Sequence, residues 1–176
     1  MHPSPKLGSS PDLGGMEIRR DEPNFGIGVQ GCMIVVVWGR VVEVGDIKAL
    51  TAVQYETVDR YGCCLVLSVI RAGIKMTVDD EVRKAGEVNL KEFERFTRGS
   101  AMVVEAGGLR ASFFRSVITG IHLIARSPVP QKIFDNIDDA VLWLADRPGV
   151  DRTTLDELTL VPSVYAMADH FGEPVA

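Results

Sequence analysis

The residue types that most often carry chemistry are few in this chain and far apart. Its three histidines are His2, His122 and His170, and none has a second ligand at the spacing of a metal site. No G-x-S-x-G nucleophile elbow occurs. We therefore expect no catalytic residue, no metal and no cofactor, and we predict that the protein is not an enzyme.

One acidic residue keeps a catalytic hypothesis open. Glu105 follows a predicted buried strand, so its carboxylate is expected at the C-terminal edge of a sheet, where α/β proteins often place their sites. Thr77 is expected at the same edge. An enzyme with a site near Glu105 and Thr77 is therefore one hypothesis, and a solvated carboxylate at the rim is the simpler interpretation.

The stretch GIGVQG, residues 26–31, has the glycine spacing of a dinucleotide-binding fingerprint. That fingerprint needs a helix after the glycines, because the pyrophosphate binds at the helix N-terminus. The residues that follow here, CMIVVVWG, predict a strand instead. We expect the glycines to allow a tight hairpin rather than to bind a nucleotide.

The three cysteines, Cys32, Cys63 and Cys64, all lie among valine, isoleucine and leucine. Cys63 and Cys64 are neighbours on a predicted strand, so they point to opposite faces and cannot bind one metal ion together. Cysteine in such surroundings behaves as a small hydrophobic residue. We expect buried thiols and a reducing, cytoplasmic location.

Charge and hydropathy argue against two classes of partner. The 176 residues carry a formal net charge of −5 and no run of basic residues, whereas nucleic acids and anionic membranes attract basic surfaces. The longest apolar run, Cys32 to Trp38, is too short to span a bilayer. We expect no nucleic-acid partner and no integral membrane segment.

Alternating apolar strands and amphipathic helices predict an α/β layered domain over residues 24–147. The expected order is ββαβαβαβα, a mostly parallel central sheet that begins with a hairpin. Strands are expected in FGIGVQGC, MIVVVWGRV, CCLVLSVI, SAMVVEA and PQKIFDN. Helices are expected at 44–61, 77–97, 109–125 and 137–145. Asp46 is expected to cap the first helix and Asn136 the last. Gly86 and Asn89 are candidate interruptions of the second.

Both ends of the chain differ in composition from this domain. Residues 1–23 are rich in proline, glycine and serine, so we expect a flexible tail. Residues 148–176 contain Pro148, Gly149 and Pro162 as helix breaks. We expect a C-terminal extension there with one or two short helices, near 155–158 and 164–171.

The predicted helix 109–125 carries two apolar stripes, whereas a helix that covers one side of a sheet needs only one. The second stripe indicates either deep burial or contact with a partner or ligand. The candidate interface residues on this helix are Arg110, Phe114, Arg115, Ile118, Ile121 and His122.

The element order, the strand–turn–helix corner at residues 63–82 and two further stretches resemble the STAS-like domains. These include the anti-sigma-factor antagonists and a broader bacterial group described as STAS-like or CRAL-TRIO-like. VVVWGRVVEVGDIKAL is similar to the family's strand, turn and first helix, and ARSPVPQKIFDNIDDAVLWL to its last strand and helix. The resemblance covers residues 30–146.

In the phosphoregulated antagonists, a serine or threonine begins the helix after the strand equivalent to Cys63–Ile70. The resemblance therefore implies Thr77 as a candidate regulatory hydroxyl, where a phosphate would meet a helix N-terminus. The family's Asp-Ser pair is missing here, so a plain helix cap is the simpler interpretation of Thr77.

Two binding functions follow. The resemblance implies a non-enzymatic protein-interaction or regulatory module, self-associating as a homodimer through helix 109–125 and the C-terminal residues. The alternative is a binder of a lipid or other apolar ligand between helices 79–97 and 109–125. The candidate lining residues of that pocket are Phe93, Phe96, Phe113 and Phe114.

Overall fold

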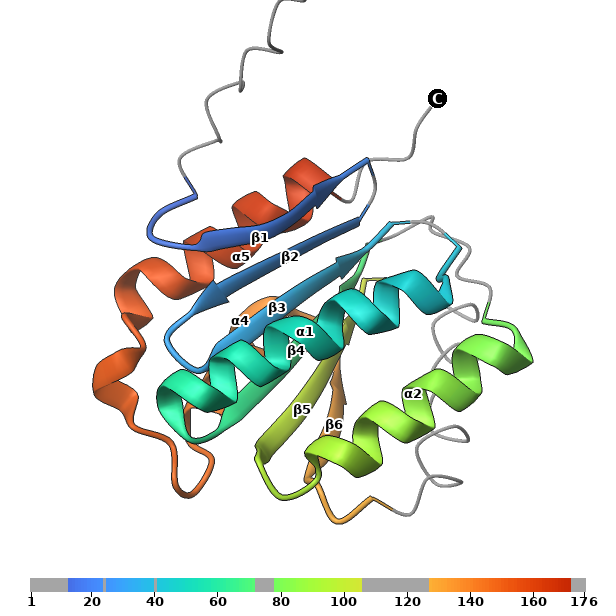
Figure 1. The fold of residues 1–176 in the computed structure, drawn as a ribbon. Coiled ribbons are helices and arrows are strands. Elements are labelled where there is room, and N and C mark those ends of the chain that lie inside the picture. The colour runs from blue at the N-terminus through green and yellow to red at the C-terminus, as the bar shows by residue number, and fades with distance from the viewer. Residues whose placement is uncertain (1–12, 24, 40, 72–77, 106–126, 172–176) are drawn as a thin grey trace, which may run out of the picture.

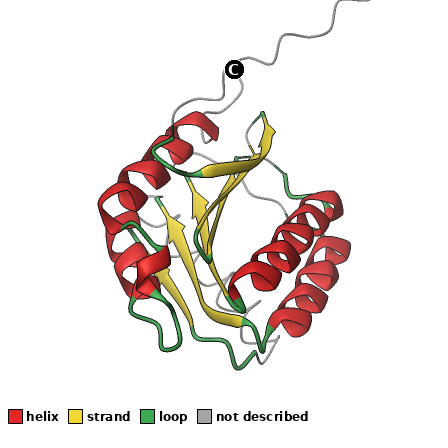
Figure 2. Ribbon diagram, turned by 60° about the vertical axis from the view of Figure 1, so that its left-hand side comes forward, coloured by secondary structure: helices red, strands yellow, loops and turns green. Residues whose placement is uncertain are grey.

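The computed structural model describes residues 13–23, 25–39, 41–71, 78–105 and 127–171. Over these ranges the chain forms three layers, a central sheet with helices on both faces (Figure 1, Figure 2). The α/β layered class predicted from the sequence is confirmed. The predicted helix 109–125 and Thr77 lie outside the described residues.

The described strands form one six-stranded sheet in the order β1-β2-β3-β4-β5-β6. The first two pairings are antiparallel and the other three are parallel, so the sheet is mostly parallel and has a hairpin near its start. The strands are β1 (Glu17–Glu22), β2 (Phe25–Gln30), β3 (Met33–Trp38), β4 (Cys64–Ile70), β5 (Thr97–Val104) and β6 (Gln131–Phe134).

The described helices lie on both faces of the sheet (Figure 2). On one face, α1 (Val44–Tyr61) and α2 (Asp80–Phe93) lie against one core cluster. On the other, α4 (Ile137–Ala145) and α5 (Glu157–Phe171) lie against the second cluster, with a short 3-10 turn, η1 (Arg152–Thr154), before α5. The strands between them are buried on both sides, which explains the nearly continuous apolar run of β4.

The hairpin between β2 and β3 turns at Gly31, as expected. Gly31 has φ +55°, and an added Cβ would lie 2.3 Å from the carbonyl oxygen of Thr154. The other two glycines of GIGVQG are not turn residues. Gly26 and Gly28 lie within β2, where α5 packs closely against the strand. The prediction that these glycines serve the turn is therefore correct only for Gly31.

The termini of the helices correct several expected caps. The bounds of α1 are as predicted, and Gly62 ends it in the left-handed conformation. Asp46, however, is inside the first turn and accepts a hydrogen bond from the Glu43 backbone at 2.9 Å. Asp79 caps α2 by accepting from the Val82 backbone at 2.8 Å, so this helix begins after Thr77. Asn136 caps α4, as predicted.

The two ends of the described chain are more ordered than the sequence indicates. Residues 17–22, expected in a flexible tail, form β1 and pair with β2, so the tail prediction is corrected there. Residues 157–171 form one helix that continues through Pro162, instead of two short ones. Burial of Leu160, Val164 and Phe171 against the sheet offsets the hydrogen bond that a helix loses at proline.

Candidate ligand-binding site

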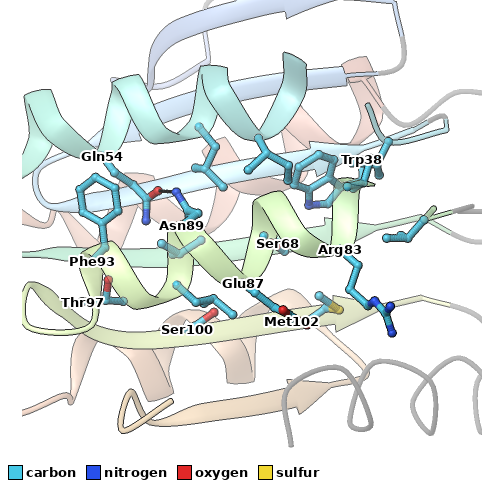
Figure 3. A pocket seen from close by; sticks show the side chains of 18 residues that line it. Trp38, Gln54, Ser68, Arg83, Glu87, Asn89, Phe93, Thr97, Ser100 and Met102 are labelled. Carbon is cyan, nitrogen blue, oxygen red and sulfur yellow. Dashed lines mark hydrogen bonds between the residues drawn. The ribbon is translucent and has the colours of Figure 1, made fainter. Parts of the chain in front are cut away.

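Between α1, α2 and the sheet lies a cavity of about 180 Å³ (Figure 3), here called the α1–α2 cavity. Strands β3, β4 and β5 form its floor. Most of its wall is apolar and includes Trp38, Leu50, Val66, Val82, Phe93 and Met102. Val78, Arg83 and Glu87 also line it and are partly exposed, so they mark its rim.

The cavity exists because α2 packs on α1 but stands away from the strands. Only three of the fourteen residues of α2, Val82, Asn89 and Phe93, are buried. Gly86 belongs to the same face of the helix, since residues three and four apart lie side by side. A Cβ added at Gly86 would have no atom within 4 Å. The absence of a side chain at this position therefore leaves space between helix and sheet.

A polar contact fixes the spacing of the two helices. The Asn89 side-chain amide donates to the Gln54 side-chain oxygen at 2.6 Å (Figure 3) and also to the Thr51 hydroxyl at 2.9 Å. Close by, the rings of Tyr55 and Phe93 meet edge to face, with centroids 4.8 Å apart. Gly86 and Asn89, expected as candidate interruptions of the helix, are instead internal to α2, where Gly86 opens the cavity and Asn89 joins the helix to α1.

Ser68 is the one hydroxyl in the strand β4 and lies on the cavity floor (Figure 3). Its neighbours in register on the adjacent strands are Val36 and Met102. Only 9% of its surface is exposed. Within the described ranges, no side chain or backbone group hydrogen-bonds its hydroxyl. Buried polar groups almost always have a partner, so this hydroxyl is available to a bound molecule.

The rim carries charges of both signs. The Arg83 guanidinium pairs with Asp80 at 3.0 Å, and Glu87 follows Arg83 by one helical turn. The Arg83 Nε is buried and has no hydrogen-bond partner among the described residues. The rim therefore offers a donor, but no excess of positive charge.

The cysteines are buried and free, as predicted. Burial, and secondarily the neighbouring Cys63, raise the pKa of the Cys32 thiol to about 12. Burial also raises the pKa of the Cys64 thiol, which is 3.5 Å from the hydroxyl of the cavity residue Thr97. Reactive cysteines have a lowered pKa, so Cys32 and Cys64 lack the character of nucleophiles.

Glu105, a sheet-edge candidate from the sequence, and His170, one of the three histidines, have structural partners, whereas Thr77 lies outside the described residues. Glu105 accepts from the Nε of Arg71 at 3.0 Å, and the same guanidinium pairs with Asp169 at 2.9 Å. His170 lies 3.6 Å from Asp21 and packs its ring against Phe171. These contacts join the strands to α5, so the arrangement around Glu105 is that of a structural ion-pair network.

Of the four aromatic residues expected to line an apolar pocket, the structure describes Phe93 and Phe96. Phe93 lines the α1–α2 cavity, whereas Phe96 is not among its described lining residues and packs against Arg95. Phe113 and Phe114 lie outside the described residues, together with Thr77 and all six candidate interface residues of helix 109–125. The described cavity lies on the α1 side of α2.

Sequence reasoning missed Gln54, Ser68 and the role of Gly86. A usable signal existed for Ser68, because it is the only hydroxyl in a strand otherwise made of apolar residues and cysteine. No comparable signal marks Gln54, which looks like a surface residue of an amphipathic helix. Its burial depends on how α2 lies against α1.

The part of the chain that the structure describes shows neither a metal-binding cluster nor a membrane-spanning helix. It contains no group of three or more histidine, cysteine, aspartate or glutamate side chains able to hold a metal ion. None of its helices has both the length and the apolarity needed to cross a bilayer.

Comparisons with known proteins return no relative. No family model matches the chain, and neither does any curated protein or solved structure.

Proposed function

We propose that this protein binds a small, largely apolar molecule in the α1–α2 cavity. The observation that carries the proposal is an apolar space of about 180 Å³ between α1, α2 and the sheet. Protein interiors have few voids larger than a water molecule. An engineered apolar cavity of about 150 Å³ accepts benzene, so this one has room for a single ring or a short chain.

The lining supports binding rather than catalysis. Ligand sites are mostly apolar with a few polar groups that orient the ligand, and this cavity combines an apolar wall with Ser68 and the Gln54–Asn89 amide pair. No described histidine lines it. A serine without an adjacent base is a poor nucleophile, so we assign Ser68 a role in binding.

Tryptophan fluorescence offers a direct test. The chain has two tryptophans, of which Trp38 lines the cavity and Trp143 packs against Phe134 on the opposite face. In a Trp143→Phe background, toluene is expected to change the emission of Trp38 in a saturable way. A response that stays linear in toluene concentration would contradict the proposal.

Two matched substitutions locate the binding. Gly86→Leu places a side chain in the open space of the cavity and is expected to abolish the saturable response. Gly45→Leu makes the same change on α1, where an added Cβ also meets nothing within 4 Å, but Gly45 is not part of the described lining of the α1–α2 cavity. This control is expected to bind toluene like the parent protein. Equal binding by both variants would place the site elsewhere.

A further inference from the structure

We propose that Ser68 selects the ligand, and that the ligand is a neutral small molecule with an apolar body and one hydroxyl or carbonyl group. This inference rests on the proposed binding function. It goes further by naming the chemical class that the cavity prefers. Three features of the site carry it: the free hydroxyl, the engagement of most other polar groups, and the balance of charge at the rim.

The first feature is the position of Ser68 at the centre of the floor. It is buried to about nine-tenths, and no described group hydrogen-bonds its hydroxyl. The flanking residues on the same face of β4 are Val66 and Ile70, which offer neither donor nor acceptor. A hydrocarbon in the cavity would leave the serine hydroxyl unpaired, whereas a ligand with one polar group can pair with it.

The second feature is that most other buried polar groups are already engaged. Asn89 bonds Gln54 and Thr51, and Thr97 bonds the Cys64 thiol. Ser100 on β5 also lines the cavity but is only half-buried, so water can reach it more easily than Ser68. The site thus offers a ligand one deeply buried hydroxyl, which fits a ligand with a single polar group.

The third feature is the charge of the rim. Arg83 is paired with Asp80, and Glu87 on the next turn adds a negative charge. A carboxylate ligand would lose its hydration in an apolar space where the described lining offers no unpaired cation, which is costly. The competing possibility is an acid that reaches the unpartnered Nε of Arg83. That atom is covered by protein, whereas the Ser68 hydroxyl faces the cavity.

The experiment compares three ligands of one size: toluene, phenol and benzoate. Dissociation constants are measured by backbone amide chemical shifts on the full chain and on Ser68→Ala and Ser100→Ala variants. The decisive quantity is the ratio of the toluene constant to the phenol constant within each variant. This ratio cancels the change in cavity size, which affects both ligands alike.

Ser68→Ala is expected to lower the ratio about fivefold, the equivalent of one ordinary hydrogen bond. Ser100→Ala is expected to leave it within about twofold of the parent value, since its hydroxyl is not the one that the ligand uses. Unfolding temperatures of both variants show that the fold is intact. Replacing an unpaired serine by alanine removes a buried polar group without leaving another unpaired, so Ser68→Ala should fold.

The outcomes separate the two proposals. If none of the three ligands binds saturably to the parent protein, the binding function itself is wrong. If toluene and phenol bind but Ser68→Ala leaves their ratio unchanged, the cavity binds ligands and the role of Ser68 is wrong. Tighter binding of benzoate than of phenol, lost on Arg83→Gln, would overturn the neutral ligand class.

Discussion

On the face of the sheet covered by α5, glycine lets a helix lie against the strands, and on the face covered by α1 and α2, glycine leaves a space. A Cβ at Gly26 would lie 2.3 Å from the ring of Phe171, and one at Gly28 would lie 2.6 Å from the sulfur of Met167. A Cβ at Gly86 would touch nothing. The same residue type thus produces close packing on one face and a cavity on the other.

Whether a glycine leads to close packing or to a cavity depends on the size of the side chains that face it. Gly26 and Gly28 lie on a strand beneath large side chains of α5, which fill the volume that the glycines leave. Gly86 lies on a helix held away from the sheet by its contacts with α1, and the floor below it carries the small side chains of Ser68 and Ser100. Where the side chains on both opposing surfaces are small, no described side chain fills the gap. Four measurements test this contrast.

The largest effect is expected from Phe171→Ala on the α5 face. Phe171 is almost fully buried, and deleting such a ring costs about 3–5 kcal/mol, through lost burial and the void that remains. Chemical denaturation measures the free energy of unfolding. A loss under 1 kcal/mol would mean that this face is not closely packed.

Gly26→Ala is expected to destabilise the fold by about 1–3 kcal/mol, because the added methyl forces the Phe171 ring to move. The two substitutions share one contact, so their effects should not add. In the Phe171→Ala background, Gly26→Ala should therefore cost little. Full additivity in the denaturation data would contradict the close approach described here.

Gly86→Ala is expected to act in the opposite direction and stabilise the protein by about 1 kcal/mol. Glycine inside a helix is less favourable than alanine by about that amount, and the new methyl meets no atom. Gly45→Ala in the first turn of α1 serves as the control, with a smaller gain expected. A loss of stability at Gly86 would show that the cavity is narrower than described.

The smallest effect concerns the contact of α4 with α5. The Tyr165 hydroxyl donates a hydrogen bond to the Asp138 carboxylate, which is the main cause that raises the pKa of Tyr165 to about 12. Because the folded state holds the Tyr165 proton more tightly than the unfolded state does, the hydrogen bond to Asp138 contributes fully to the free energy of unfolding below pH 10. This contribution disappears as the pH rises through about 12. In a phenolate absorbance titration, Asp138→Asn should lower this midpoint toward the ordinary value. An unchanged titration would argue against the contact.

Much of the fold follows from local patterns in the sequence. The bounds of α1, the turn at Gly31 and the Asn136 cap were all predictable, because each depends on residues close together in the chain. Strand β1 was not, since it is rich in charge and gains its order from pairing with β2. The helix through Pro162 was missed for a related reason, because its stability comes from packing on the sheet.

The cavity was less predictable than the fold. The ligand pocket expected from the resemblance lay between residues 79–97 and 109–125, and the second of these ranges is outside the described residues, whereas Phe93 lines a different cavity, between α1, α2 and the sheet. The position of the described cavity depends on the separation of α2 from β4 and β5, which no local pattern encodes. Gly86 and Asn89 were noticed as irregular, but their effect on helix spacing becomes visible only when α1 is in place.

The two outermost strands of the described sheet affect how the protein behaves at high concentration. Along β1, five of the six residues are charged, and β6 at the opposite edge is only four residues long and follows Pro130. Charged and short edge strands resist the addition of another strand. We therefore expect concentrated samples to resist fibrillar aggregation through strand pairing, and any self-association to use helical surfaces instead.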